Sequence, residues 1–190
     1  MTYLSPAKIN LFLHVTSKRA DGYHNLQTIF QLLDYYDEIS LDYREDGAIN
    51  RISGNEGIPQ DQDLVLRSAT ILKKISGSKG GVDISIAKKI PMGGGLGGGS
   101  SNAATVLIAL NKLWNLSLSK EDLMAIGQNI GADVPVFVNC HSCWGEGIGE
   151  ILTPISLPKY FYLIVSIGKH ISTKEIFTHK ALTMSPVQRK

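Results

Sequence analysis

Six glycines lie between Gly93 and Gly99, and only Leu96 interrupts them. They follow a strand-like run of alternating residues at 82–90 and lead into a helix-like run at 102–114. Glycine lets the backbone reach positive φ and lets a ligand approach the peptide groups closely. A helix that follows such a loop directs its unpaired N–H groups and the positive end of its dipole into it. The order of strand, glycine loop and helix therefore predicts a phosphate-binding site.

Two common phosphate-binding loops do not fit this stretch. A Walker A loop requires a lysine directly after its last glycine, whereas Ser100 follows Gly99 here. Residues 93–98 satisfy G-x-G-x-x-G, but a dinucleotide-binding fold requires a second strand soon after the helix. A second helix-like run, 120–130, comes instead. A flexible glycine linker is the remaining alternative, and the apolar structured runs on both sides argue against it.

Lys8, Asn10 and Asp133 could supply further chemistry. Residues 7–15 alternate between apolar and other side chains, which indicates a half-buried strand whose apolar face serves the core. Lys8 and Asn10 are two residues apart and should point the same way, toward a site or toward solvent. Asp133 follows the helix expected at 120–130 and precedes a short strand expected at 136–138; it could cap a turn or act as a base. If Asp133 faces Lys8 across the glycine loop, an anion cradle, a cation and a base come together, although sequence spacing does not show that they meet.

Tyr23 and His24 lie beside a tight turn. Asp21-Gly22 is a strong turn signal, and a strand-like run follows at 26–33. An aromatic ring and an imidazole in this position could hold a planar ligand. They could equally belong to a simple hairpin.

Composition narrows the class of protein. The chain has 190 residues, a net charge of +2 and 43% hydrophobic residues, which suits a globular protein without a strong nucleic-acid or membrane surface. Neither a secretory pattern nor a long apolar stretch is present, so a cytoplasmic location is expected. Cys140 and Cys143 form a single C-x-x-C pair, for which a redox pair and half a zinc site are alternatives; two reduced thiols are expected.

The remaining pattern predicts an α+β fold. Further strands are expected at 37–43, 144–152 and 160–167, and further helices at 63–75 and 172–182. Residues 47–62 are expected to form a polar loop. Ser119 and Asp122 resemble a capping box at the start of the helix at 120–130. A weak boundary near 154–158 suggests one domain at 1–155 and the beginning of a second at 156–190.

The glycine loop resembles that of the GHMP kinases, the superfamily of galactokinase, homoserine kinase, mevalonate kinase and phosphomevalonate kinase. The superfamily pattern has a proline, three residues, Gly-Leu-Gly and then Ser-Ser-Ala; here Pro91, Gly95-Leu96-Gly97 and 100–104 match it, with two extra glycines. That extended form is similar to the members that phosphorylate a cytidine-diphosphate-linked methylerythritol. Four further segments resemble segments of the same family, and they follow one another in the family's order. They are 5–11, 19–30, 131–137 and 146–154.

The resemblance implies an N-terminal GHMP-kinase domain with helices packed on a mixed sheet, followed by the start of a C-terminal α+β domain. It implies transfer of the γ-phosphate of ATP to the 2-hydroxyl of that substrate, in the non-mevalonate route to isoprenoids. Lys8 and Asp133 would be the catalytic pair, with Asp133 accepting the hydroxyl proton. The substrate would contact Asn10, Tyr23, His24, Thr173 and Phe177, with Tyr23 stacked on the cytosine and His24 bonded to its edge.

By the same resemblance, the phosphates of ATP would be wrapped by the glycine loop and its flanks, and Mg²⁺ would lie near Ser101. The residues of this ATP site are Pro91, Met92, Gly93, Gly94, Gly95, Leu96, Gly97, Gly98, Gly99, Ser100 and Ser101. Asp63 replaces an asparagine that the family usually has on the adenine side. The expected partners are ATP and the small-molecule substrate, with neither nucleic acid nor membrane, and the expected state is a monomer or weak homodimer.

Two other functions remain open at this point. Family members are longer than this chain, so a non-catalytic nucleotide-binding fragment is one alternative. Another GHMP kinase, such as a homoserine kinase, is the second, and the turn at 21–24 argues against it.

Overall fold

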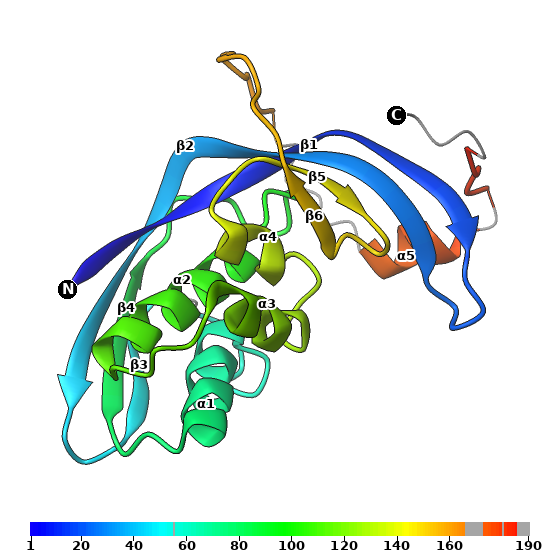
Figure 1. Ribbon diagram of the computed structural model, residues 1–190. Coiled ribbons are helices and arrows are strands. Elements are labelled where there is room, and N and C mark those ends of the chain that lie inside the picture. Colours follow the sequence, from blue (N-terminus) through cyan, green and yellow to red (C-terminus); the bar gives the residue numbers. More distant parts are fainter. Residues whose placement is uncertain (55, 166–172, 180, 186–190) are drawn as a thin grey trace.

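A computed structural model describes residues 1–54, 56–165, 173–179 and 181–185. A twisted sheet built on two long strands carries a group of helices on one face (Figure 1). The elements are, in order, β1 Thr2–Lys18, β2 His24–Arg44, β3 Ile49–Ser53, α1 Leu64–Ser76, β4 Gly81–Ala87, α2 Gly98–Leu113, α3 Lys120–Gln128, α4 Val134–Asn139, β5 Cys143–Glu146, β6 Ile151–Pro154 and α5 Thr173–Thr178.

β2 is the strand around which the sheet is built. It pairs antiparallel with β1 over almost its whole length, while its two halves pair on the other side with β5 and β4. β3 then lies parallel to β4, and β6 lies antiparallel to β5. The sheet is therefore mixed, and the predicted α+β class with helices on a mixed sheet is confirmed.

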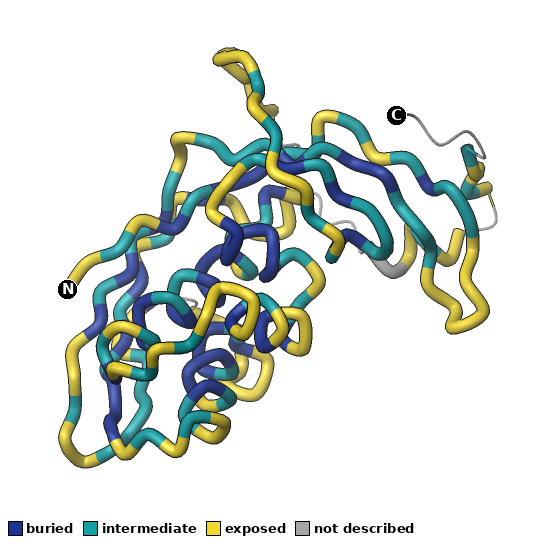
Figure 2. Tube along the Cα trace, in the orientation of Figure 1, coloured by how far each residue is buried: buried dark blue, intermediate teal, exposed yellow. Residues whose placement is uncertain are grey.

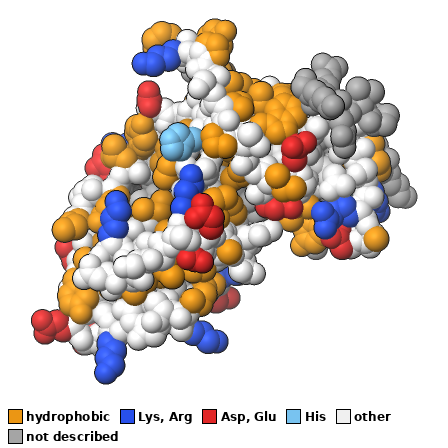
Figure 3. All heavy atoms as spheres, in the orientation of Figure 1, with side chains coloured by type: hydrophobic (Ala, Val, Ile, Leu, Met, Phe, Trp, Pro, Cys, Tyr) orange, Lys and Arg blue, Asp and Glu red, His pale blue; other side chains and the backbone are white. Residues whose placement is uncertain are grey.

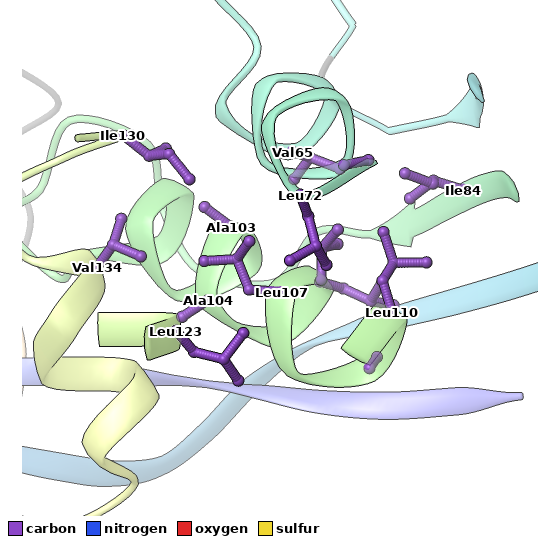
Figure 4. Packing of buried hydrophobic residues seen from close by; sticks show 14 of the residues in the cluster. Val65, Leu72, Ile84, Ala103, Ala104, Leu107, Leu110, Leu123, Ile130 and Val134 are labelled. Atoms are coloured by element: carbon purple, nitrogen blue, oxygen red, sulfur yellow. The ribbon is translucent and has the colours of Figure 1, made fainter. Parts of the chain in front are cut away.

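α2 is the centre of the hydrophobic core. Figure 4 shows its side chains between those of α1, α3 and α4, with Ile84 of β4 beside them. Leu107 and Leu110 are fully buried there, and Figure 2 shows buried positions gathered in these helices and the strands they cover. Because the glycine loop leads directly into α2, the loop is attached to the most firmly packed helix of the fold.

Two helices begin as their sequences predict. The capping box of Ser119 and Asp122 is present at the start of α3. Asp63 caps α1, since its carboxylate accepts a hydrogen bond of 2.8 Å from the amide of Val65. Asp63 is also buried and paired with Arg51 of β3, so it has a structural task in this fold.

Several predicted strand boundaries are wrong. Residues 26–33 and 37–43 belong to one strand, β2, because β1 pairs with it across the intervening residues. The expected polar loop at 47–62 contains β3, which adds to the edge of β4. Residues 144–152 form parts of two strands, β5 and β6, which a turn at 147–150 joins. Pairing between distant segments decides these boundaries, and local composition does not report it.

The short strand expected at 136–138 is a helix, α4. A short apolar run bounded by turn signals fits a buried strand and a buried helix equally well. Pro135 stands in the first turn of α4, where its fixed φ and missing N–H favour a helix start. Asp133 therefore lies between two helices, where the sequence predicted a helix and a strand.

The strand expected at 160–167 is absent from its described part, 160–165, and residues 166 and 167 lie outside the described residues. Phe161 and Leu163 are fully or almost fully exposed, and hydrophobic side chains crowd this projecting segment in Figure 3. A strand requires a neighbour, and no strand of the described residues pairs with this segment. α5 is also shorter than the helix expected at 172–182.

β1 does not present a continuous apolar face to the core. Ala7 and Val15 are buried as expected, but Leu11 and Leu13 are 40% and 45% exposed. The pairing of β1 with β2 shifts register between Asn10 and Leu13. Such a bulge changes which side chains face the core, so strict alternation fails beyond Asn10.

Candidate active site

A cavity of about 610 Å³ opens beside the glycine loop. Five segments that are far apart in the sequence form most of its wall: the middle of β1, the first half of β2, the stretch at 58–65 that leads into α1, the loop at 91–99, and the residues just before α4. Lys8, Asn10 and Asp133 all line it, as does Phe177 of α5. The cavity therefore brings together the predicted cation, the predicted base and the predicted anion cradle.

Lys8 is a buried lysine whose ammonium group has three neighbours. Its Nζ donates a 2.7 Å hydrogen bond to Oδ1 of Asn10 and lies 3.4 Å from Oδ2 of Asp133. It also lies 5.6 Å from the centroid of the Phe30 ring, within cation–π range. The solvated strand face considered for Lys8 is thus wrong, since its side chain is only 7% exposed.

Asp133 reaches Lys8 because it occupies the turn between α3 and α4. It is the residue before α4, yet its carboxylate makes no capping hydrogen bond to that helix. The side chain is 36% exposed and borders the cavity. The capping task considered for Asp133 is therefore not the one it performs here, and its carboxylate faces Lys8 and the cavity together.

The glycine loop is fixed at its middle rather than left loose. Leu96 is buried and packs with Ala7 and Ile90, and its carbonyl accepts a 2.9 Å hydrogen bond from the backbone N–H of Lys8. Gly97 has φ of +71° and is the N-cap of α2. A Cβ at Gly97 would lie 2.7 Å from the Phe137 ring and 3.2 Å from Lys8 Cγ. Only glycine allows this close approach.

The first turn of α2 points into the same space. The helix begins at Gly98, earlier than the expected residue 102, and Gly98 and Gly99 line the cavity. The first N–H groups of a helix have no intrahelical acceptor, and they carry the positive end of its dipole. An α-helix of 16 residues with a glycine-lined start is an arrangement suited to a phosphate group.

Asn10 is held between Lys8 and Thr28. Its Nδ2 donates a 2.8 Å hydrogen bond to Oγ1 of Thr28, whose hydroxyl donates to the carbonyl of Phe12. Because both polar atoms of the Asn10 amide have protein partners, its position fixes the direction of the Lys8 side chain. The predicted alignment of Lys8 and Asn10 on one side of the strand is confirmed.

The predicted substrate-binding residues lie toward the β1–β2 hairpin. The Asp21-Gly22 turn is present, with Gly22 at φ +86°. The rings of His24 and Phe177 stack with centroids 5.7 Å apart, while Tyr23 is 62% exposed at the hairpin tip. Thr173 begins α5, and its side chain lies outside the described part of the structure. Phe177 reaches the cavity wall, and Tyr23 and His24 do not.

Ser101 does not fit a Mg²⁺ ligand in this arrangement. It is fully buried, its Oγ accepts a 2.8 Å hydrogen bond from Ser5, and it is not part of the cavity wall. In the described part of the chain, no cluster of three or more metal-binding side chains occurs. The prediction of Mg²⁺ therefore rests on the family resemblance.

Reasoning from the sequence alone missed several residues of the site. Thr28 and Phe30 lie in β2 opposite β1, and Phe137 lies in α4; each touches a predicted residue only through tertiary structure. The alternation of β2 could have indicated Thr28 and Phe30 as inward-facing, since both are buried. Phe137 was hidden by the wrong assignment of its segment.

The two cysteines take no part in this site. Cys140 is exposed and Cys143 is buried, and both are free thiols, as expected. Burial raises the pKa of the Cys143 thiol, and hydrogen bonding to Asn139 only partly opposes it.

None of the helices in the described ranges is long and apolar enough to cross a membrane.

Comparison with known proteins agrees with this architecture. Residues 63–141 match the GHMP kinases N terminal domain. A mevalonate kinase from Methanococcus jannaschii shares the fold, with a TM-score of 0.61 over 82% of this chain and 56% of that one, at 16% identity. The chain therefore carries the N-terminal domain of the GHMP kinases at 63–141.

Two relatives and one solved structure bear the name of the same kind of enzyme. The 4-diphosphocytidyl-2-C-methyl-D-erythritol kinase of Ruthia magnifica is 60% identical over the whole chain, and that of Vesicomyosocius okutanii is 57% identical. A crystal structure of 4-(cytidine 5'-diphospho)-2C-methyl-D-erythritol kinase aligns at 39% identity with a TM-score of 0.74, over 83% of this chain and 56% of that one. The chain spans 66% of the length of the Ruthia magnifica enzyme and 66% of that of the Vesicomyosocius okutanii enzyme.

Proposed function

We propose that this chain carries the ATP-binding and catalytic part of a kinase that phosphorylates the 2-hydroxyl of 4-diphosphocytidyl-2-C-methyl-D-erythritol. The observation that supports it most strongly is the contact between Lys8 and Asp133 in the wall of the glycine-lined cavity. The names of the relatives supply the substrate, and the glycine loop with the start of α2 suits the phosphates of ATP.

Positioning and charge would do most of the catalytic work. Phosphoryl transfer passes through a loose transition state, so the protein chiefly aligns the groups and stabilises charge. The loop at 91–99 would hold the phosphates against the N–H groups of α2. The substrate hydroxyl would approach from the side of Asp133, where the cavity wall is formed by β1 and the residues before α4.

Asp133 would accept the proton of the attacking hydroxyl. The ammonium of Lys8, 3.4 Å away, pairs with this carboxylate and orients it toward the cavity. Lys8 is itself held by Asn10, and Asn10 by Thr28. Catalytic groups held in this way lose less conformational freedom when the substrate binds. Asn10 would thus act through Lys8, while its contact with the substrate remains a prediction.

The cytidine end of the substrate would lie toward the hairpin. Tyr23 is exposed and available for stacking, and His24 and Phe177 already form an aromatic pair nearby. We therefore retain Tyr23, His24, Phe177 and Thr173 as proposed substrate contacts. Four other expectations stay predictions: a cytoplasmic location, Mg²⁺, a monomer or weak homodimer, and a division into domains at residue 155.

The decisive test is release of ADP from Mg-ATP with and without the diphosphocytidyl methylerythritol, for the chain and for Asp133→Asn. Substrate-dependent ADP that falls about 10²–10⁴-fold in Asp133→Asn, with ATP affinity retained, would support the proposal. Saturable ATP binding without any ADP release would instead identify a binding fragment. Normal turnover by Asp133→Asn would remove Asp133 from the catalytic role.

A further inference from the structure

A buried carboxylate that takes no part in the proposed phosphoryl transfer lies behind the glycine loop. Asp37 of β2 is fully buried and lies outside the wall of the cavity. A buried charge is expensive unless it is paired and hydrogen-bonded. The partners of Asp37 therefore indicate what its burial achieves.

One oxygen of Asp37 holds the entrance of the loop. Its Oδ1 accepts hydrogen bonds from the backbone N–H groups of Lys89 and Ile90, at 2.7 and 2.8 Å. These two residues directly precede Pro91, the first residue of the loop. Ile90 also packs with Leu96, so the entrance is attached both to the sheet and to the middle of the loop.

The other oxygen holds the exit of the loop. Asp37 Oδ2 accepts a 2.9 Å hydrogen bond from Nδ2 of Asn102, which is fully buried in the second turn of α2. The same Nδ2 donates to Oγ of Ser5 in β1, at 2.9 Å. A single carboxylate thus connects the residues before the loop with the helix after it.

Lys88 balances the charge of this bridge. Its Nζ lies 2.5 Å from Asp37 Oδ2 and donates a 3.0 Å hydrogen bond to Oδ1 of Asn102. Burial alone would raise the pKa of Asp37. The hydrogen bonds from Lys88, Ile90, Lys89 and Asn102 outweigh it and hold that pKa below its usual range.

General stabilisation is a weak explanation for such an arrangement. Replacing a buried ion pair by apolar residues is often neutral or stabilising, so a buried pair is poor evidence for a contribution to stability. What the pair does in this fold is geometric, because its contacts lie on both sides of the same loop. A loop fixed at both ends presents its N–H groups in one arrangement.

We propose that Asp37 is a positioning residue that bridges the two ends of the phosphate loop and so sets the affinity for the phosphates of ATP. This inference rests on the proposed function, since it assumes that ATP binds at the loop. Asp37 acts through Lys89, Ile90 and Asn102 and does not touch the nucleotide itself. Its loss should therefore weaken phosphate binding selectively.

The test is a swap of the two bridge partners. In Asp37→Asn, the new amide group faces Lys88 and the amide of Asn102, and the bridge to α2 is lost. In the double variant Asp37→Asn with Asn102→Asp, the carboxylate lies on α2, where it still pairs with Lys88 and accepts from the new amide at 37. The two backbone N–H groups keep an acceptor in both variants.

Titration calorimetry with ATP and with adenosine separates positioning from folding. We expect Asp37→Asn to weaken ATP binding at least about tenfold, since misplacement by about 1 Å can cost about 100-fold in an oriented site. Adenosine binding should change less than twofold, and the swap should recover most of the ATP affinity. If Asp37→Asn does not fold, Asn102→Ala removes the bridge to α2 together with the contacts of Asn102 to Ser5 and Lys88, and it should show the same selective loss.

Glu38→Gln is the matched control. Glu38 is the neighbour of Asp37 and pairs with Lys89 Nζ in an exposed ion pair at 2.6 Å, so its loss should leave both affinities unchanged. If Asp37→Asn lowers the affinities for ATP and adenosine equally, or leaves ATP affinity unchanged, this inference is wrong while the proposed function stands. Failure of the unaltered chain to bind ATP would overturn the proposed function and this inference with it.

Discussion

The backbone N–H of Lys8 donates a 2.9 Å hydrogen bond to the carbonyl of Leu96 in the middle of the glycine loop. The same residue that directs its ammonium toward Asp133 is thus the residue that anchors the loop. The distance between the phosphate cradle and the Lys8–Asp133 pair is therefore set by this backbone contact and by the reach of the Lys8 side chain. Changes to the loop and changes to the pair should be coupled.

Substitution of Gly97 should be far more damaging than substitution of Gly95. Both have φ near +70°, so alanine at either position carries a backbone cost of about 1–2 kcal/mol. Only at Gly97 would the new methyl group meet Phe137 and Lys8, at 2.7 and 3.2 Å; nothing lies within 4 Å of a Cβ at Gly95. We expect about 1–3 kcal/mol of additional loss in the free energy of unfolding for Gly97→Ala.

Urea unfolding of the two variants measures this difference directly. Gly97→Ala should also lower turnover more than ATP affinity, because relief of the clash displaces Lys8. Equal unfolding free energies for the two variants would contradict the close contact with Phe137.

Replacement of Thr28 by valine should lower turnover while ATP affinity stays within about twofold. Thr28 is fully buried, and its hydroxyl oxygen accepts a hydrogen bond from Nδ2 of Asn10. Thr28→Val leaves that donor without its partner, at a cost of about 1–3 kcal/mol. Asn10 and then Lys8 lose their fixed orientation. Steady-state kinetics with ATP and the acceptor substrate varied in turn separate the two effects.

Thr16→Val supplies the control for this experiment. The Thr16 hydroxyl also donates within the β1–β2 hairpin, to the carbonyl of Asn25, but it has no contact with Asn10 or Lys8. A loss of turnover in Thr16→Val equal to that in Thr28→Val would indicate a general effect of the hairpin.

Replacement of Tyr23 by alanine should weaken binding of the cytidine substrate without affecting folding. Tyr23 is 62% exposed, so its loss removes little buried surface. Stacking of a base on an aromatic ring contributes about 1–3 kcal/mol, which corresponds to a rise of roughly 5- to 150-fold in KM. Tyr43 is similarly exposed at 54% and lies away from the cavity, so Tyr43→Ala should leave KM unchanged. An unaltered KM in Tyr23→Ala would exclude the stacking role.

The stability of the fold should fall in acid through protonation of Asp37. Its pKa is lower in the folded chain than the value of about 3.9 for unfolded aspartate. The stabilisation is therefore fully present above the unfolded pKa and is lost as pH falls through the lower folded pKa. Urea unfolding between pH 7 and pH 2 should show a stability difference between the unaltered chain and Asp37→Asn at pH 7, and this difference should narrow below about pH 4. A difference independent of pH would contradict the lowered pKa.

The local features of the site follow from short stretches of sequence. The glycine loop between a strand and a helix, the capping box at Ser119 and the turn at Asp21-Gly22 depend on neighbouring residues. A glycine at positive φ and a capping side-chain oxygen act on their neighbours in the chain, so short-range sequence reports them. The superfamily pattern consists of the same residues. For this reason the phosphate loop and the α+β class could be predicted without coordinates.

Which of these features meet depends on how the chain folds in three dimensions. The contact of Lys8 with Asp133, the bulge that exposes Leu11 and Leu13, and the bridge from Asp37 to Asn102 join residues far apart in the chain. Strand pairing and helix packing fix such contacts through burial and through hydrogen bonds between distant segments, which leave no regular spacing in the sequence. The helix at 134–139 shows the same limit, since a short buried apolar run becomes strand or helix according to what packs around it.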